Sequence, residues 1–215
     1  MTRIRVTAAL GRIVPLLALF AAAGFTSSAA AHAALVEPNA VAGSYHKASV
    51  RIGHGCEGSP TVAVRVFVPA GLEGAKPQPK PDWDVSLRKV ALERPYTSHG
   101  KTVTEDVAEI EWRVRDRARA LPDGQFDEFA FFGRLPDRPG LAWVRVLQTC
   151  EQGQLDWAER PAEGASTRGL KAPAALLRLL PPPSEPVALP APVPAPAPVK
   201  APAAPAVPAE HQHAH

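Results

Sequence analysis

Short segments of alternating polar and apolar residues, separated by turn residues, recur about every ten residues from Leu35 onward. The clearest is Thr61–Pro69, TVAVRVFVP, in which valine occupies every second position. No segment before about Leu170 has the periodicity of an amphipathic helix, and only Ala174–Leu180 looks briefly helical. This pattern predicts an all-β sandwich. The other expected strands are Tyr45–Ile52, Trp83–Val90, Val107–Val114, Phe126–Phe132, Leu141–Thr149 and Leu155–Glu159, with a loop at Arg94–Lys101.

Residues 1–31 have the three parts of a secretory signal peptide. Three arginines near the start are followed by an apolar run, Ile13–Phe25, and by small residues, Ser27–Ala31. The run is shorter than the roughly 20 apolar residues that a transmembrane helix needs. Cleavage after a small-x-small motif would leave either His32 or Ala34 as the first residue, and cleavage rules alone leave both open. We expect a periplasmic or secreted protein without a transmembrane anchor in its mature form.

The C-terminal part of the chain differs in composition from the predicted sandwich. The sandwich domain is expected over residues 32–180, a Pro/Ala-rich linker over residues 181–210 and a histidine-rich terminus over residues 211–215. A segment of Pro, Ala and Val cannot form a core and favours extended polyproline-II structure. We predict that the terminal histidines form an auxiliary metal-capturing arm, although a tail without a binding role accounts for them equally well. These histidines are His211, His213 and His215.

The positive charge of the chain belongs to the signal peptide. The formal net charge is +3 and the isoelectric point is near 9.1. Of the 24 Lys and Arg residues, three precede His32 and no acidic residue does, so the remaining positive charges balance the 21 Asp and Glu residues. The mature chain therefore has no electrostatic feature that favours nucleic acid as a partner.

The chain has two cysteines, Cys56 and Cys150, and we predict that they form a disulfide because the chain has an export signal. Closing so long a loop stabilises a fold by about 4–5 kcal/mol in the chain-entropy description. The alternative is a thiolate metal site made of Cys56 and the nearby His54. It requires a reduced cysteine in an oxidising compartment.

A histidine at the start of a mature chain has a chemical property that no internal histidine shares. If cleavage precedes His32, the α-amine and the ring Nδ1 of this residue can chelate one metal ion. Amine and imidazole nitrogens suit Cu(II). The one methionine is Met1, which is lost with the signal peptide, so a thioether Cu(I) site is excluded.

The order of several short motifs resembles the YcnI-like (DUF1775) family of exported copper-binding proteins over residues 32 to about 180. The motifs are His32, Ala40-x-x-Gly43-Ser44-Tyr45, Gly53-His54-Gly55-Cys56-Glu57-Gly58-Ser59, Lys80-Pro81-Asp82-Trp83, Arg94-Pro95-Tyr96-Thr97-Ser98-His99-Gly100-Lys101-Thr102-Val103-Thr104-Glu105, Asp127-Glu128-Phe129 and Gln148-Thr149-Cys150-Glu151-Gln152-Gly153.

The resemblance implies a cupredoxin-like β-sandwich that holds Cu(II) in a monohistidine brace. In such a brace the amine and ring of the first mature residue bind the metal beside a tryptophan. These roles fall on His32 and Trp157, which favours cleavage before His32. The resemblance also implies a carboxylate ligand, and the candidates are Glu37, Asp156 and Glu159.

Three functions are consistent with these features. We expect a monomeric, non-enzymatic Cu(II)-binding protein that sequesters copper or delivers it to another exported copper chaperone or a copper importer. A secreted adhesion or interaction module without a metal is the alternative. A histidine-brace copper oxidase is the third possibility, and it needs a second imidazole from His46, His54 or His99. Two of these histidines, His54 and His99, lie in expected loops, where a surface position explains them equally well.

Overall fold

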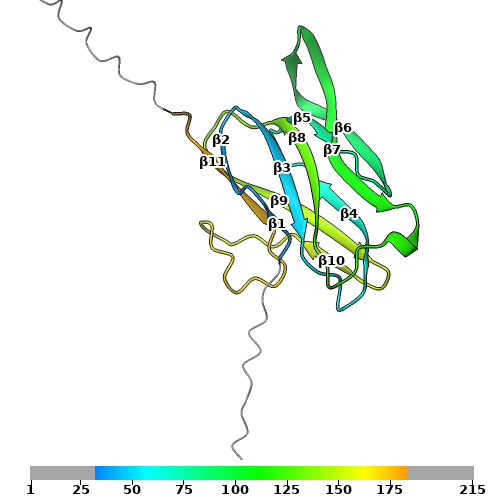
Figure 1. Cartoon of the computed structure of the whole chain (residues 1–215). Helices are drawn as coiled ribbons and strands as arrows, with labels where there is room; N and C mark the ends of the chain where they lie inside the picture. The colour runs from blue at the N-terminus through cyan, green and yellow to red at the C-terminus, as the bar shows by residue number, and fades with distance from the viewer. Residues whose placement is uncertain (1–31, 184–215) are drawn as a thin grey trace, which may run out of the picture. The chain divides into compact units, whose positions relative to one another are not determined.

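The computed structural model describes residues 32–183, which form a sandwich of two β-sheets (Figure 1). A four-stranded sheet has the order β1 (Ala34–Leu35), β3 (Tyr45–Ile52), β8 (Asp127–Arg134) and β5 (Glu73–Pro77). A seven-stranded sheet has the order β2 (Asn39–Val41), β11 (Ala175–Leu180), β9 (Gly140–Cys150), β4 (Thr61–Phe67), β7 (Lys101–Val114) and β6 (Trp83–Ser98), and β10 (Gln154–Trp157) pairs with β9.

The hydrophobic core lies between the two sheets and is built from residues at alternating strand positions. Val50 of β3 and the pair Val64 and Val66 of β4 are fully buried. Trp112 and Phe129, from opposite sheets, meet edge to face with ring centroids 5.8 Å apart. Burial of a side chain of this size stabilises the fold by about 1.5–3 kcal/mol. The predicted all-β sandwich is therefore confirmed.

Two local predictions are wrong. Ala174–Leu180 was expected to be helical, but Ala175–Leu180 is strand β11, in which buried and more exposed residues alternate with a period of two. A short apolar segment fits either a helix or a strand, and pairing with β9 and β2 selects the strand. Arg94–Lys101 was expected to be a loop, but β6 continues to Ser98 and turns at His99 and Gly100 into β7.

The disulfide between Cys56 and Cys150 is confirmed. It joins the loop after β3, in the first sheet, to the last residue of β9, in the second sheet. The two sheets are thus linked covalently at the end of the sandwich where β3 and β9 both finish.

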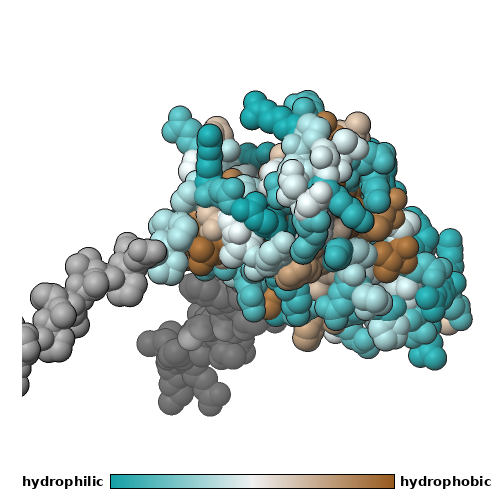
Figure 2. Space-filling view, turned by 90° about the horizontal axis from the view of Figure 1, so that it is seen from above, coloured by the Kyte–Doolittle hydropathy of each residue, from teal (hydrophilic) through white to brown (hydrophobic). Residues whose placement is uncertain are grey.

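The face shown in Figure 2 is mostly hydrophilic, and its apolar patches are small and separate. Within residues 32–183 no helix is long and apolar enough to cross a membrane. The predicted signal peptide, the linker beyond residue 183 and the three terminal histidines lie outside the described residues.

Candidate metal centre

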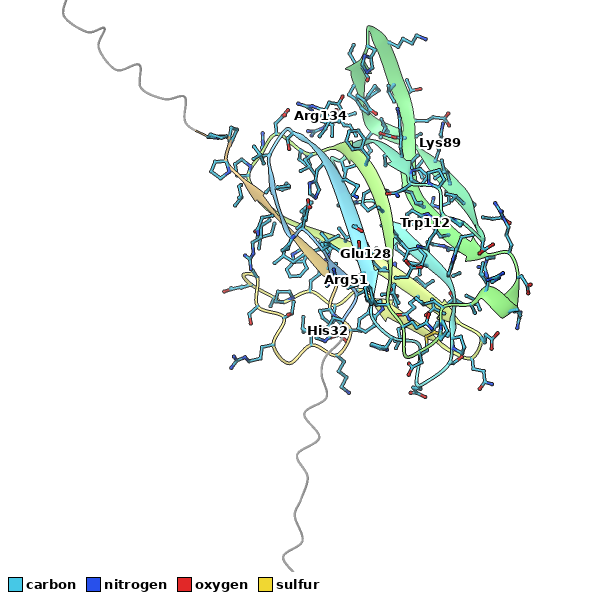
Figure 3. All side chains as sticks on the ribbon, viewed as in Figure 1. His32, Arg51, Lys89, Trp112, Glu128 and Arg134 are labelled. Carbon is cyan, nitrogen blue, oxygen red and sulfur yellow. A yellow bond between two sulfur atoms is a disulfide. The ribbon has the colours of Figure 1, made fainter. Side chains whose placement is uncertain are left out.

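The register between β1 and β3 determines where His32 lies. The two strands are antiparallel, with Ala34 opposite Arg51. Continuing this register by two residues places His32 opposite Gly53, which directly precedes His54. Figure 3 shows His32 at the start of the chain's described part, at the same end of the sandwich as Arg51. The first residue of the predicted mature chain therefore lies beside the loop that follows β3.

Strand β10 places Trp157 at the same end of the molecule. The strand pairs with β9, with Trp157 opposite Val146. Side chains of a strand alternate between its two faces, and in β10 the face that carries Trp157 is buried. The indole is only 4% exposed, and its Nε1 donates a hydrogen bond of 3.1 Å to Oε1 of Gln148. The orientation of the indole ring is therefore fixed by both packing and hydrogen bonding.

Two histidine rings contact Trp157. The ring centroid of His32 lies 5.9 Å from that of Trp157 at an interplanar angle of 76°. The corresponding values for His54 are 6.1 Å and 79°. Both contacts are edge-to-face, a geometry that aromatic rings prefer. The structure thus gathers one tryptophan and two imidazoles from three separate segments of the chain.

The buried side chain of Gln148 connects these segments. It is 1% exposed. Its Nε2 donates to the carbonyl oxygen of His54 at 2.7 Å and to the hydroxyl of Thr61 at 2.8 Å, while its Oε1 accepts from Trp157. An amide has two N–H donors, so both are used. Without Gln148 the buried indole N–H of Trp157 would lose its hydrogen-bond partner, which is costly.

The tautomer of His54 follows from its own loop. Its Nδ1 lies 2.5 Å from the carbonyl oxygen of Gly55. A carbonyl oxygen can only accept, so Nδ1 carries the proton in this contact. Metal-binding histidines usually donate their second N–H to a carbonyl or carboxylate in this way. The loop requires glycine at position 55, because a Cβ there would collide with the carbonyl of Ser59.

The carboxylate candidate Asp156 lies on the opposite face of β10 from Trp157. It forms a two-pronged ion pair with Arg145, at 2.8 and 2.6 Å. Among the described residues it forms its side-chain hydrogen bonds with Arg145 and not with His32. An aspartate next to an inward-facing tryptophan on a strand necessarily points outward.

The other two carboxylate candidates also interact elsewhere. Glu159 is exposed, and its Oε2 accepts a hydrogen bond of 2.9 Å from the backbone N–H of Lys171. Glu37 is exposed, and its charge acts on His46. Within residues 32–183 neither forms a hydrogen bond or an ion pair with His32. A carboxylate ligand stays a prediction.

The two remaining candidates for a second imidazole lie elsewhere. The Nε2 of His46 is buried without a hydrogen-bond partner in the described part of the chain. Burial lowers the pKa of His46, and the charge of Glu37 partly opposes this effect. His99 is exposed in the turn between β6 and β7. Of the three histidines, the structure brings His54 alone to Trp157.

The donor set at this end of the sandwich fits copper. Residues 32–183 contain no group of three or more His, Cys, Asp or Glu side chains that could hold a metal ion. A brace does not need such a group, because one of its donors is the main-chain amine. With His32 as the first residue, its amine and its own imidazole would lie beside Trp157, and Cu(II) favours nitrogen donors of this kind.

A family model described as "Domain of unknown function (DUF1775)" matches residues 32–179. The chain belongs to the DUF1775 family. The match covers the whole sandwich of this DUF1775 protein, from His32 to the end of β11. No curated protein matches the chain.

Two solved structures resemble this DUF1775 domain. One is an uncharacterized protein from Nocardia farcinica with an immunoglobulin-like fold. The two structures have a TM-score of 0.54 and 21% sequence identity, and the match covers 69% of this chain and 97% of that chain. At this identity the likeness shows the fold alone. The other is a putative membrane anchored protein from Corynebacterium diphtheriae, with a TM-score of 0.34, 10% identity, and coverage of 71% of this chain and 35% of that chain. That TM-score is too low to bear on the fold.

Sequence reasoning found His32, and the family resemblance supplied Trp157. The sequence alone did not indicate a role at this site for Gln148 or Thr61, and it did not distinguish His54 from the other loop histidine, His99. One signal was available, since a disulfide between the two cysteines brings the residues next to them together. His54 lies two positions before Cys56, and Gln148 lies two positions before Cys150.

Proposed function

We propose that this DUF1775 protein is an exported Cu(II)-binding protein that sequesters or delivers copper. Copper is held by the amine and ring Nδ1 of His32 after the signal peptide is removed. The observation that carries the proposal is the edge-to-face contact between the rings of His32 and Trp157. The contact holds the ring of the first residue of the predicted mature chain against an indole that is itself buried and hydrogen-bonded.

The fold supports this role by holding the first residues in place. Ala33 is 4% exposed, and the next two residues pair with β3. The backbone after His32 and the ring of His32 are therefore both held in place before a metal binds. Preorganisation of this kind raises affinity because less conformational freedom is lost on binding.

The proposed location is the periplasm or the extracellular medium. The disulfide supports it, because disulfides persist in oxidising compartments. We propose no catalytic role and a monomeric state, with another exported copper chaperone or a copper importer as the partner. A metal-free interaction module does not explain the ring cluster.

The first experiment determines the N-terminus and the copper content of the exported protein. Intact mass and N-terminal sequencing of the protein recovered from the periplasm or medium should give a chain that begins at His32 and binds one Cu(II) per chain. A chain that begins at Ala34 would refute the proposal, because the brace could not form.

Variants then assign the metal to the brace. The three terminal histidines are first replaced by alanine so that they cannot contribute. In this background, His32→Ala and a chain with one extra residue before His32 should both lose tight binding, whereas His99→Ala should not. Tight binding that survives the extra residue would contradict the proposal.

A histidine-brace copper oxidase is the second candidate function, and the position of His54 favours it. Such an enzyme uses two histidines and an amine, and the contact of His54 with Trp157 makes it the candidate for the second histidine. Copper-dependent turnover of peroxide or oxidation of a polysaccharide in the presence of a reductant would support it. We expect neither activity from a carrier.

A further inference from the structure

We propose that the outer face of the four-stranded sheet binds an acidic polysaccharide. The site consists of Tyr45, Lys47, Lys76 and Phe132, which we call the aromatic–lysine face. Tyr45 is opposite Arg134, which Figure 3 shows at the other end of the sandwich from His32. The site is therefore separate from the candidate metal centre and needs no metal.

Two aromatic rings are exposed side by side on this face. Tyr45 of β3 is 61% exposed and Phe132 of β8 is 44% exposed. Their rings are stacked, with centroids 5.4 Å apart and an interplanar angle of 5°. An apolar side chain that is exposed singly needs no explanation, whereas adjoining apolar groups with a polar rim are typical of a binding surface.

The strand register places a lysine on each side of Phe132. This residue is opposite Lys47 on β3 and opposite Lys76 on β5. Directly opposite residues carry their side chains on the same face of a sheet. Neighbouring strands are about 4.8 Å apart, so the backbones of the two lysines are roughly 10 Å apart. The exposed ring therefore lies between two positively charged residues.

The positive charge of the two lysines is not neutralised by the protein. Within residues 32–183 neither lysine forms an ion pair, whereas the acidic residues nearby do. Glu73 pairs with Arg134 at 3.3 Å, and Glu128 pairs with Arg51 at 3.0 Å. The charge left over on this face is positive, so it attracts an anionic ligand.

A hollow of about 730 Å³ lies beside the aromatic pair. The sheet lines it with Tyr45, Phe132 and Lys76. Residues 96–99 of the β6–β7 hairpin, which projects beyond the rest of the sandwich in Figure 1, line it from the other side. Ligand sites in proteins have volumes of about 300–1,000 Å³. The hollow is large enough for a ring of the ligand to lie against the aromatic pair.

Hydrogen bonds fix the wall that the hairpin provides. The hydroxyl of Tyr96 donates to Oδ2 of Asp106 at 2.7 Å. The same oxygen accepts from the backbone N–H of Gly74, in β5, at 2.8 Å. The hairpin is thus tied to the first sheet next to the site. A site whose walls are already in place loses less conformational freedom on binding.

A second hollow of about 180 Å³ continues along the same face and is lined by Lys47 and Ala130. Ala130 precedes Phe132 by two positions on β8, so the two residues lie on one face, about 7 Å apart. The larger hollow borders Phe132 and the smaller one borders Ala130. The two hollows therefore follow one another along the strand, which suits an extended polymer better than a compact ligand.

An acidic polysaccharide matches both the rings and the charges. The C–H groups of a sugar ring carry partial positive charge and pack on the negative face of an aromatic ring. The carboxylates of uronic acids recur along the polymer and can pair with a lysine on either side of the aromatic pair. Nucleic acid also combines rings with negative charge, but the proposed location outside the cytoplasm favours a polysaccharide.

The test is binding of polygalacturonate to the mature, metal-free full chain, measured by isothermal titration calorimetry. Low salt keeps screening weak, and at pH 8 histidines are mostly neutral. We expect polygalacturonate to bind, dextran, which has sugar rings without charge, not to bind, and polyphosphate, which has charge without rings, to bind more weakly. No binding of polygalacturonate, or equally tight binding of polyphosphate, would overturn the proposal.

Substitution of the two rings tests their role. The double variant Tyr45→Leu, Phe132→Leu keeps apolar side chains on the strands and should weaken polygalacturonate binding at least about fivefold. Phe126→Leu is the matched control, since Phe126 is 65% exposed and lies outside both hollows, and it should bind like the parent. Thermal melting checks that the variants fold. Unchanged affinity in a folded double variant would contradict the proposal.

Substitution of the two lysines tests the charges. Lys47→Gln with Lys76→Gln should weaken binding by about 2–30-fold, as expected for the loss of two exposed ion pairs. Lys89→Gln with Lys171→Gln removes the same charge from exposed positions elsewhere and should have little effect. An equal loss in both pairs would show that affinity follows net charge alone and would overturn the proposal.

Two further probes identify a different partner. Tighter binding of phosphatidylglycerol vesicles or of oligothymidylate than of polygalacturonate, with loss of that binding in the double ring variant, would assign the face to a membrane or to nucleic acid and overturn the polysaccharide. None of these measurements uses copper, so their failure leaves the proposed function untouched.

Discussion

Gln148 offers the sharpest test of how the metal centre is built into the fold. The prediction is that Gln148→Met destabilises the apo protein strongly, although methionine has nearly the same length and is more apolar. The substitution removes three hydrogen bonds at once, to Trp157, to His54 and to Thr61. In an ordinary core position, a change of this kind between side chains of similar volume costs less than about 1.5 kcal/mol.

The expected magnitude follows from the partners that are left behind. A buried polar group without a partner costs about 1–3 kcal/mol. The indole N–H of Trp157 is deeply buried and bears this cost in full, whereas the carbonyl of His54 belongs to a half-buried residue and can be partly hydrated. The hydroxyl of Thr61 keeps a weak contact of 3.8 Å with Cys150. We therefore expect a loss of about 2–4 kcal/mol in the free energy of unfolding.

The assay is equilibrium unfolding in urea, followed by tryptophan fluorescence, on the metal-free protein with its disulfide intact. The loss corresponds to a fall in melting temperature of roughly 4–16 °C, at about 2–4 °C per kcal/mol for a domain of this size. Gln154→Met is the matched control, since Gln154 is exposed on β10, and it should stay within about 0.5 kcal/mol of the parent. Equal stability of the two variants would show that the Gln148 network does not hold the site together.

Three further predictions follow from the same structure. Asp156→Asn should leave Cu(II) affinity unchanged in a titration, because the carboxylate faces Arg145; a large loss would identify Asp156 as the carboxylate ligand. Replacing both disulfide cysteines by serine should lower the free energy of unfolding by up to about 4–5 kcal/mol in denaturant titrations, and it should weaken copper binding because the His54 loop is released. Burial, followed by the hydrogen bond to Asp106, raises the pKa of Tyr96 from 10.0 to about 12. Because the unfolded state loses this proton first, the free energy of unfolding should decrease as the pH rises from 10.0 to about 12. Tyr96→Phe should remove the contribution of Tyr96 to this decrease. An identical pH profile in the variant would contradict the prediction.

The sequence predicted those strands whose pattern is local. The alternating valines of β4 specify a strand regardless of the rest of the chain, and the structure places them in the core. The segment that became β11 lacks such a pattern because its leucines are also compatible with a helix, so only its neighbours β9 and β2 decide. The end of β6 was missed because Pro95 suggests a loop, whereas in the fold this residue falls at a register irregularity between Ala91 and Tyr96, where a missing N–H is tolerated.

The site was only partly predictable for a related reason. The chemistry of His32 depends on its being first in the mature chain, and a cleavage motif is local. The contact of His54 with Trp157 depends on the pairing of β9 with β10, and on the disulfide and the Gln148–His54 hydrogen bond, each of which joins residues 94 positions apart. For Gln148 the sequence signal is its position two residues before Cys150, and its role is recognised only when its three partners are known.

Three events have to precede copper binding at the proposed site. In the precursor the nitrogen of His32 belongs to a peptide bond and has no lone pair to offer, so the amine donor exists only after cleavage. The His54 loop is held by a disulfide, which forms in an oxidising compartment. His54 and Trp157 come together only when the sheets have paired. Cleavage, oxidation and folding are therefore all required, and the uncleaved chain in the reducing cytoplasm should not compete for copper at this site. A precursor that retains residues 1–31 should fail to bind Cu(II) tightly at His32 even when it is folded and oxidised, and tight binding there would show that the amine is not a ligand.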